Sequence, residues 1–271
     1  LEELQSEQLW TRALRDADID VPVPVPTSIG SNYAEVKVCG QTRLAGMLKW
    51  VNGVTMLSLL EDQTGSEVTA KRFFQIGELL AKIHNQACSW KPPKTFSRHS
   101  FNLDGLVGEH PFWGRFWEGR LTNKEQRCWL REARHQVCAI LTRYGETPET
   151  YSLIHADLHP GNVIVNGGQL HIIDFDDSGF GWHQYDFSNA LFEYREHRDL
   201  SVMQKALFKG YRQHRCLTDQ AISYVPLFLV IRALACIGWY SDRPEHDERS
   251  NISGLIEYSS NALEGALAMC S

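Results

Sequence analysis

Several features that would indicate particular classes of protein are absent from this sequence. Its seven cysteines are odd in number and scattered and include no CxxC pair, which argues against a disulfide framework and against a zinc site. The most apolar stretch, residues 224–231, ends at Arg232 and falls short of the roughly 18 apolar residues of a membrane span. Internal repeats and low-complexity tracts are also lacking. We therefore expect a cytoplasmic protein with free thiols and no membrane partner.

An excess of charge of one sign is missing as well. The chain has 27 Lys and Arg residues against 33 Asp and Glu residues, which gives a formal net charge of −6. Such a balance does not suit a protein that coats nucleic acid or an anionic membrane. Hydrophobic residues make up 43% of the 271 residues, enough for a sizeable core in one large or two small domains. The composition favours small-molecule chemistry.

The first 52 residues form a small unit with its own pattern. Residues 1–16 carry leucines and a tryptophan at helical spacing, and prolines at alternate positions then predict an extended connection. Residues 33–38 and 43–51 read as two strands joined by a turn at residues 39–41, and Asn52-Gly53 marks a break. We expect a strand-containing unit over residues 1–52.

Residues 53–271 are mainly helical in pattern. Apolar residues at helical spacing predict six helices, and two short strands surround a Gly-Gly turn at residues 167–168. The expected helices cover residues 69–86, 123–143, 185–195, 200–214, 221–241 and 252–269. The expected strands cover residues 162–165 and 171–173. The predicted fold class is α+β, with a small first unit and a large, mainly helical second unit.

One segment of the second unit carries an ordered set of chemistry-bearing residues. His155-Ala-Asp157-Leu-His-Pro-Gly-Asn162 repeats the histidine, the Asp-Leu pair and the spacing of five between Asp and Asn found in the catalytic loop of protein kinases. Asp174 and Phe175 follow the next apolar strand, where kinases have an Asp-Phe-Gly segment. Phosphoryl transfer needs a carboxylate beside the acceptor hydroxyl and oxygen ligands that hold magnesium on the phosphates. The set therefore indicates a phosphoryl-transfer centre.

Two other interpretations of these residues exist. A single acidic residue in a loop is as often a solvated turn residue, but that interpretation does not explain an ordered set of five flanked by two apolar strands. The pattern His155-x-Asp157-x-His159 is also typical of metal ligands and would suit a metallohydrolase. That interpretation needs further ligands and gives Asn162 no role.

The motifs resemble those of the aminoglycoside phosphotransferase and choline kinase family. The segments 153–162 and 172–177, followed by Tyr185-Asp186-Phe187, are similar to the family's catalytic loop, metal-binding strand and the turn after it. The helix with Gly77 and His84 resembles a further family segment. The resemblance implies a protein-kinase-like fold, with residues 1–52 as a partial N-terminal lobe and residues 53–271 as the helical C-terminal lobe that carries the catalytic loop and the acceptor site.

The resemblance also implies roles for individual residues and a need for ATP and Mg²⁺. Asp157 would be the catalytic base, and Asn162 and Asp174 would hold magnesium. The remaining implied roles are structural support of the site by His155 and Asp186, and nucleotide binding by Trp50 and Val51 in the hinge and by Glu7 in the first helix.

The sequence departs from the family at its beginning. The family's first three strands, with the phosphate-covering loop and the lysine that grips the phosphates, would precede residue 1, and no glycine-rich loop is present. Glu7 stands where that lysine's partner would be. We expect these 271 residues to be an incomplete form of a longer kinase. The alternative is a naturally shortened homologue that binds ligand weakly or acts as a pseudokinase.

The acceptor site of the family lies between the catalytic loop and the C-terminal helices. Carboxylates beside aromatic rings suit an amine or a quaternary ammonium group. The candidates here are Asp176, Asp177, Trp182, Glu193, Trp239, Tyr240 and Asp242. The aromatic run Phe112, Trp113, Phe116 and Trp117 would form a lid or simply pack the helical lobe. We expect an amino-alcohol, aminoglycoside-like or amino-acid acceptor. The rivals are a protein Ser/Thr acceptor and a ligand-binding scaffold without turnover.

Overall fold

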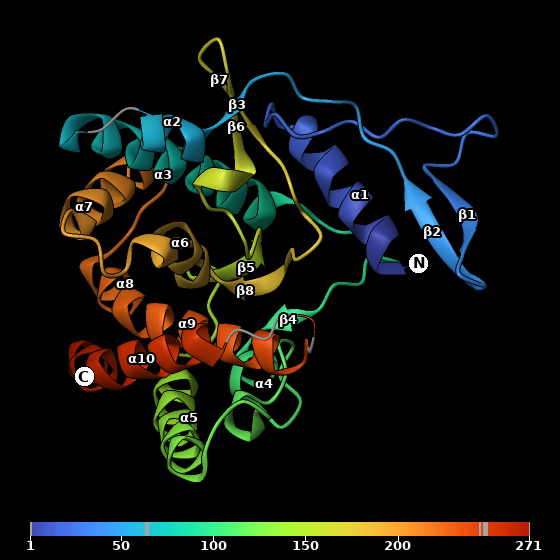
Figure 1. The fold of residues 1–271 in the computed structure, drawn as a ribbon. Coiled ribbons are helices and arrows are strands. Elements are labelled where there is room, and N and C mark those ends of the chain that lie inside the picture. The colour runs from blue at the N-terminus through green and yellow to red at the C-terminus, as the bar shows by residue number, and fades with distance from the viewer. Residues whose placement is uncertain (1, 63–64, 244, 246–248, 271) are drawn as a thin grey trace.

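The computed structural model describes residues 2–62, 65–243, 245 and 249–270. Helices dominate it, and the strands form three small sheets (Figure 1). The α-helices are α1 (Glu2–Arg15), α2 (Met56–Asp62), α3 (Ser66–Ser89), α4 (Leu103–Val107), α5 (Lys124–Tyr144), α6 (His183–Leu191), α7 (Leu200–Tyr211), α8 (Asp219–Ser223), α9 (Val225–Ser241) and α10 (Arg249–Met269). The short 3-10 helices are η1 (Phe116–Glu118), η2 (Pro160–Asn162) and η3 (Phe192–Tyr194). The strands are β1 (Tyr33–Val38), β2 (Gln41–Gly46), β3 (Val54–Thr55), β4 (Ser100–Phe101), β5 (Tyr151–Ile154), β6 (Val163–Asn166), β7 (Gln169–Ile172) and β8 (Gly179–Trp182).

Helix α1 is attached to the helical body by its apolar face. Trp10 and Leu14 are fully buried, and the Trp10 indole packs edge-on against Phe175 with ring centroids 5.7 Å apart. The Trp10 Nε1–H donates to Gln86 Oε1 of α3 at 2.9 Å, so the polar atom of this buried ring is satisfied. Acidic residues in the first turn and arginines in the last complement the helix dipole. The first helix is therefore fixed directly on the segment that follows β7.

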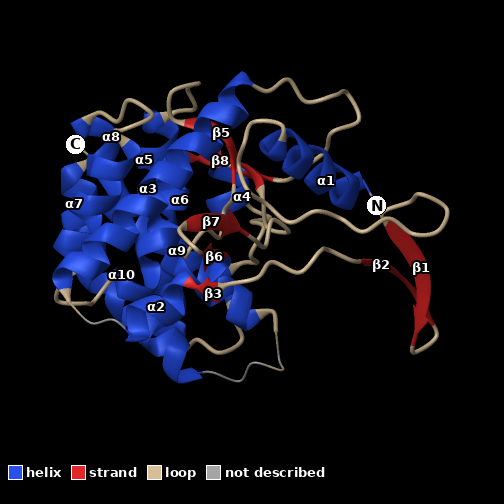
Figure 2. Ribbon diagram, turned by 90° about the horizontal axis from the view of Figure 1, so that it is seen from above, coloured by secondary structure: helices blue, strands red, loops and turns tan. Residues whose placement is uncertain are grey.

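Residues 22–50 project from the body as an extended structure, here called the arm (Figure 2). It contains the antiparallel pair β1–β2, whose two-residue turn places Cys39 and Gly40 in the left-handed region. The predicted second strand is wrong at its end, because β2 stops at Gly46. The backbone then pairs with the proline-rich connection instead: the Lys49 N–H donates to the Val23 carbonyl at 2.8 Å. The arm contains no buried side chain.

Helices α3 and α7 cross at two glycines. A Cβ on Gly77 would lie 2.0 Å from the Leu207 carbonyl oxygen, and one on Gly210 would lie 2.0 Å from the Phe74 carbonyl oxygen. Real Cβ atoms do not approach this closely, so the two helix backbones touch because neither glycine carries a side chain. This crossing fixes the distance between the two helices that lie behind the catalytic loop.

The stretch Asp219–Ser241, which comprises α8 and α9, is long and apolar enough to cross a membrane by length and composition. The prediction that the apolar stretch ends at Arg232 and is too short for a membrane span is therefore wrong. In the folded protein 72% of its most apolar window is buried, and α9 packs between α6 and α10 in the middle of the helical body (Figure 1). The segment is in the position of a core helix.

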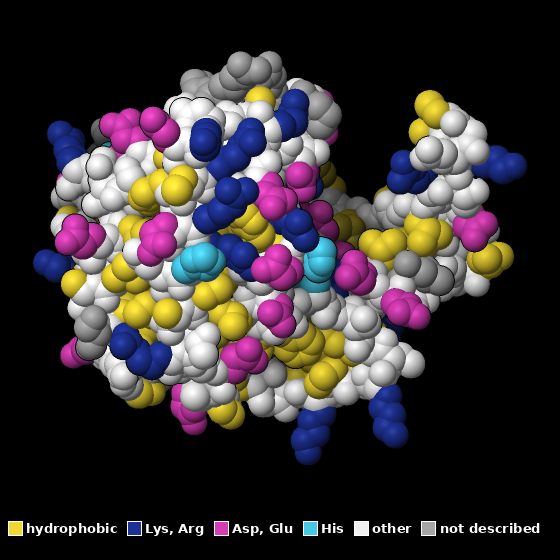
Figure 3. Space-filling model, turned by 90° about the horizontal axis from the view of Figure 1, so that it is seen from below, with side chains coloured by type: hydrophobic (Ala, Val, Ile, Leu, Met, Phe, Trp, Pro, Cys, Tyr) yellow, Lys and Arg dark blue, Asp and Glu magenta, His cyan; other side chains and the backbone are white. Residues whose placement is uncertain are grey.

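The antiparallel pair β6–β7 places the two ends of the motif together, as the sequence predicted. Val163 lies opposite Ile172, and the Ile173 N–H donates to the Asn162 carbonyl at 3.0 Å. Asn162 and Asp174 thereby lie at the same end of one hairpin. A space-filling view from below shows acidic and basic side chains interspersed over that face of the body, with the arm standing away from it (Figure 3).

Candidate active site

The loop between β5 and β6 is held by one buried carboxylate. Ala156 is fully buried and has a φ of 66°, a conformation that a non-glycine residue keeps only when its surroundings fix it. Asp186 of α6 provides that restraint. Its Oδ2 accepts from the His155 N–H at 3.1 Å, and its Oδ1 accepts from the Ala156 N–H at 2.7 Å. The backbone that presents Asp157 therefore depends on Asp186.

Asp186 is itself fixed by a chain of buried hydrogen bonds. His84 Nε2 donates to Asp186 Oδ2 at 3.0 Å, and the Tyr211 hydroxyl lies 2.9 Å from His84 Nδ1. Burial lowers the pKa of His84 well below its ordinary value, so the ring is neutral and accepts from Tyr211. Burial also raises the pKa of Asp186 to about 6. Helices α3, α6 and α7 thus meet at one polar network behind the loop.

His155 is fully buried beneath the same loop. Its Nε2 donates to the Ile173 carbonyl at 3.0 Å, and its Nδ1 accepts from the Asp157 N–H at 3.3 Å. Both ring nitrogens are occupied by the backbone on either side of the site. His159 Nδ1 accepts from the Gly161 N–H at 3.1 Å. A metallohydrolase that uses both histidines as ligands would have to break a backbone contact of His155.

Asp157 lies at the surface of a pocket with both carboxylate oxygens in contact. Oδ2 accepts from Asn162 Nδ2 at 3.2 Å, and Oδ1 accepts from Arg232 of α9 at 2.8 Å. The Asp157 side chain is 22% exposed, so an acceptor hydroxyl can reach it. Arg232 was missed as a site residue in the sequence. The signal for it was a single charge inside an otherwise apolar run.

Asp174 lies just after β7, where three acidic side chains gather. Its φ is 69°, so this residue too is held in the left-handed region. A hydrogen bond that the protonated Asp174 carboxyl donates to Asp176, together with burial, raises the pKa of Asp174 to about 7. Burial, with the charges of Asp176 and Asp157, raises the pKa of Asp177 to about 6. The positive charges of Arg232 and Arg98 offset only part of the effect on Asp177, and a bound cation would add positive charge to these carboxylates.

The residues fit a magnesium ion that arrives with a nucleotide. Asn162 Nδ2 points at Asp157, where it also donates to the main-chain oxygen at 3.0 Å, and this leaves the amide oxygen as a ligand beside Asp174. Within the described residues, no group of three or more His, Cys, Asp or Glu side chains has the geometry of a self-sufficient metal site. Magnesium commonly binds through one or two protein ligands together with substrate phosphates and waters.

A cleft of about 310 Å³, here called the α1 cleft, lies between α1, the arm and the segment after β7. Glu7, Leu48 and Asp174 are among its lining residues. Trp50 is 87% exposed and, like Val51, does not line it. The residues from this part of the arm that line the cleft are Gly46, Met47 and Leu48, which precede the predicted hinge residues in the sequence. The reason is the pairing of residues 47–49 with the proline-rich connection.

Glu7 lies near a cation that the sequence did not indicate. Burial raises the pKa of Glu7, while the charge of Arg98 lowers it. The Arg98 guanidinium donates to the main-chain oxygens of Asp176 and Ser178 and, at 3.3 Å, to that of Glu3 in α1. Arg98 therefore connects the first helix to the acidic segment after β7.

A second cavity, here called the α9 pocket, has a volume of about 300 Å³ and has Asp157 in its lining. It is lined by three carboxylates, one guanidinium and aromatic rings. The lining residues are Trp113, Asp157, Asp177, Glu193, Arg232, Ala235, Cys236, Trp239 and Tyr240. Four of the predicted acceptor residues, Asp177, Glu193, Trp239 and Tyr240, are thus brought together beside Asp157.

Other predicted acceptor residues lie elsewhere. Trp182 is 1% exposed, and its Nε1–H donates to the Gly145 carbonyl at 2.8 Å, so it belongs to the core. Asp176 lines the α1 cleft, and Asp242 lies against Gly114. In the predicted aromatic lid Trp113 lines the α9 pocket, Phe112 stacks on His99, and Phe116 and Trp117 are buried.

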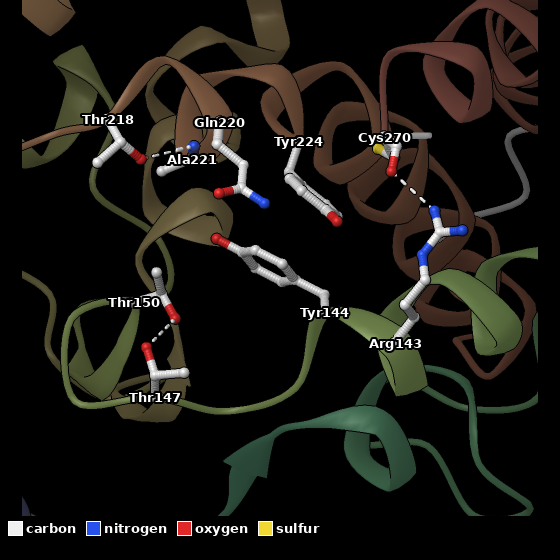
Figure 4. A pocket seen from close by; sticks show the side chains of 9 residues that line it. All are labelled: Arg143, Tyr144, Thr147, Thr150, Thr218, Gln220, Ala221, Tyr224 and Cys270. Atoms are coloured by element: carbon white, nitrogen blue, oxygen red, sulfur yellow. Dashed lines mark hydrogen bonds between the residues drawn. The ribbon is translucent and has the colours of Figure 1, made fainter.

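A cavity of about 510 Å³ is larger than either the α1 cleft or the α9 pocket and has no carboxylate in its lining. It lies among the C-terminal end of α5, α8, the start of α9 and the C-terminal end of α10 (Figure 4). Tyr144 and Tyr224 stack at 3.8 Å in its wall, and Arg143 donates to the Cys270 carbonyl at 2.7 Å. Its polar groups are mainly threonine hydroxyls and contain neither a carboxylate nor a motif residue. Cavity size alone does not identify the active site.

Comparison with known proteins defines the class. Residues 1–217 match the model of the phosphotransferase enzyme family, and the chain belongs to this family. Its fold is that of the protein-kinase-like phosphotransferases, as predicted.

Three relatives are informative. Over 229 residues the chain is 23% identical to amicoumacin kinase of Bacillus subtilis (strain 168), a match that covers 72% of this chain and 68% of that protein. A microcompartment-associated aminopropanol kinase superposes with a TM-score of 0.82 at 28% identity, covering 98% of this chain and 80% of the other. Amicoumacin kinase hAmiN, in complex with AMP-PNP, Ca²⁺ and Ami, superposes with a TM-score of 0.76 at 18% identity, covering 97% of this chain and 78% of the other. The family therefore includes proteins that bind a nucleotide and a divalent metal.

Proposed function

We propose that this protein transfers the γ-phosphoryl group of ATP to the hydroxyl of a small amino alcohol, acting in the cytoplasm. The observation that carries the proposal is that Asp157 and Asp174, which belong to one motif, line two different cavities. Asp157 lines the α9 pocket, while Asp174 lines the α1 cleft, and Asn162 contacts Asp157. An acceptor in one cavity and a nucleotide in the other would meet at these residues.

The proposed roles follow from the contacts. Asp157 orients the acceptor hydroxyl and takes its proton as the oxygen attacks phosphorus. Asn162 and Asp174 hold Mg²⁺, which supplies positive charge to the phosphates when bound. His155 and Asp186 hold the loop that carries Asp157, and Glu7, with Arg98, keeps α1 against the acidic segment.

The lining of the α9 pocket supports a cationic acceptor. Three carboxylates against one guanidinium leave the pocket with a net negative charge, and Trp113, Trp239 and Tyr240 add aromatic rings. Ammonium groups are stabilised by both features. A neutral alcohol gains neither interaction, and an amino acid brings a carboxylate that the pocket repels. The likeness to an aminopropanol kinase supports the same class of acceptor.

Two rival functions make different predictions. A protein Ser/Thr acceptor needs an open surface for an extended peptide, whereas the α9 pocket has the size of a small molecule. A pseudokinase or scaffold has no need of Asp157, Asn162 and Asp174 in one place. The aminopropanol kinase is longer than the segment matched here, so the test includes any longer form that the gene encodes.

The test is ADP release from Mg-ATP with a panel of acceptors. We expect turnover with 1-amino-2-propanol and ethanolamine, and little with homoserine, a serine-containing peptide or propane-1,2-diol. Asp157→Asn should lower kcat by about a hundredfold or more, because a general base contributes that much.

A control separates loss of catalysis from loss of binding. Stabilisation by Mg-ATP should persist in Asp157→Asn, since saturation at a hundred times Kd raises the unfolding free energy by about 2.7 kcal/mol. Nucleotide stabilisation without ADP release from any acceptor, in both the 271-residue chain and a longer form, would favour the pseudokinase. An unchanged rate in Asp157→Asn would remove this residue from its role.

A further inference from the structure

Arg232 is a charged residue in an unusual place. It lies on α9, the core helix, and with Cys236 and Trp239 it forms the face of that helix that lines the α9 pocket. Its side chain is only 17% exposed. A buried guanidinium is costly unless it is paired, and the partner here is Asp157 Oδ1 at 2.8 Å. The guanidinium also lies over the Tyr185 ring, 6.0 Å from its centroid.

The three carboxylates of the α9 pocket are not equivalent. Asp157 has an ion-pair partner, whereas no ion pair within the described part of the chain involves Asp177 or Glu193. A cation that enters the pocket is attracted by all three. If an ammonium group paired with Asp157, it would take the place that the acceptor hydroxyl must occupy, and the complex would be unproductive.

The geometry points to a role for Arg232 that rests on the proposed function. We propose that Arg232 is a specificity-determining residue that sets the orientation of a cationic acceptor, because its charge repels the ammonium group from Asp157 and directs it to Asp177 and Glu193. The hydroxyl end of the acceptor then faces Asp157. Selectivity among otherwise attractive sites is commonly achieved by such a repulsive element.

Binding of an amine without a hydroxyl isolates this effect from catalysis. The probe is propan-1-amine, titrated by calorimetry into wild-type protein and Arg232→Gln. Without the guanidinium, Asp157 becomes a third place for the cation, so we expect the Kd to fall about tenfold. In an Asp157→Asn background the same substitution should change the Kd less than about twofold, because the carboxylate it protects is gone.

Kinetics with 1-amino-2-propanol provide the second measurement. Arg232→Gln should lower kcat by about a hundredfold without raising KM, because the acceptor binds in the wrong orientation. Arg232→Lys keeps the charge and should retain most of the activity. Arg143→Gln, which removes a guanidinium with one carbonyl partner in the cavity of Figure 4, is the matched control and should alter neither quantity.

The outcomes separate this inference from the proposed function. Weaker or unchanged amine binding in Arg232→Gln overturns the role of Arg232, whether or not the enzyme turns over. So does failure of Arg232→Lys to restore activity while it remains folded by circular dichroism. If amine affinity rises as expected but wild type phosphorylates no amino alcohol, the electrostatic role of Arg232 stands and the proposed function fails.

Discussion

The catalytic loop and the arm are held in opposite ways. The loop carries two buried residues, His155 and Ala156, whose backbone is bound by a carboxylate that is itself buried and bonded to a histidine. The arm, residues 22–50, has no buried side chain and reaches α1 through a few polar contacts, such as the Tyr33 hydroxyl to the Leu4 carbonyl at 2.8 Å. The loop contributes Asp157 to the α9 pocket, and the arm contributes Leu48 to the α1 cleft.

The difference indicates that the loop and the arm have different roles in the site. The proposed phosphoryl transfer needs its base and metal ligands held firmly, and the loop obtains this from a buried and satisfied polar network. The proposed contact of the arm with a nucleotide would tolerate adjustment, because the arm has no buried side chain. Substitutions behind the loop should therefore affect folding stability, and substitutions in the arm should affect mainly nucleotide affinity.

The largest effect is expected for Asp186→Ala. Removal of this carboxylate leaves the buried N–H groups of His155 and Ala156 without acceptors, and each such loss costs about 1–3 kcal/mol. We expect the unfolding free energy to fall by about 4 kcal/mol, measured by urea denaturation. The matched control is Asp219→Ala at the exposed ion pair with Arg212, which should cost less than about 1 kcal/mol. Equal losses of unfolding free energy in the two variants would contradict the idea that the network behind the loop contributes more to stability than an exposed ion pair.

A second effect is the pH dependence that Asp186 introduces. Its pKa is about 6 in the folded protein against an ordinary value of 3.8, so the unfolded chain releases this proton first as pH rises. Stability from this group is complete below pH 3.8 and is lost as pH rises through 6, by about 3 kcal/mol. Urea denaturation from pH 4 to 7 should show this loss in wild type and not in Asp186→Asn. If the unfolding free energies of wild type and Asp186→Asn changed with pH in the same way, the pH dependence of stability would belong to other groups.

The smallest effect concerns the arm. Leu48 lines the α1 cleft, so Leu48→Ala should raise the KM for ATP about fivefold at unchanged kcat, which corresponds to the loss of about 1 kcal/mol of apolar contact. Trp50→Ala should change the KM less than about twofold, because that ring is exposed and outside the cleft. If Trp50→Ala raised the KM for ATP more than Leu48→Ala did, Trp50 would be the residue that contacts the nucleotide, as the sequence predicted. Both variants should unfold at the wild-type urea concentration.

The centre of the site could be read from the sequence because its members are close along the chain. Asp157, Asn162 and Asp174 belong to one loop and the hairpin that follows it, and local strand pairing was enough to place them together. The α+β class and the positions of the long helices followed from apolar periodicity for the same reason, whereas the short helices α2 and α4 were not predicted.

The errors involve contacts between distant segments. Arg232 is 75 residues from Asp157, and Arg98 is 78 residues from Asp176, so neither contact has a local signal. Trp182 was assigned to the acceptor site because it follows the motif, but strand β8 turns it into the core. The end of β2 was misplaced because apolar residues continue past Gly46, while tertiary pairing decides where the strand stops.

The glycine crossing of α3 and α7 has a consequence far from the place where it occurs. Tyr211 is the last residue of α7, and its hydroxyl holds His84, which in turn holds Asp186 beneath the catalytic loop. A methyl group at Gly77 or Gly210 would force the two helices apart and would lengthen this series of hydrogen bonds. The spacing of two helices outside the candidate active site therefore sets how firmly the proposed base, Asp157, is held, and it offers a way to weaken the enzyme in steps without altering any residue proposed to touch a substrate.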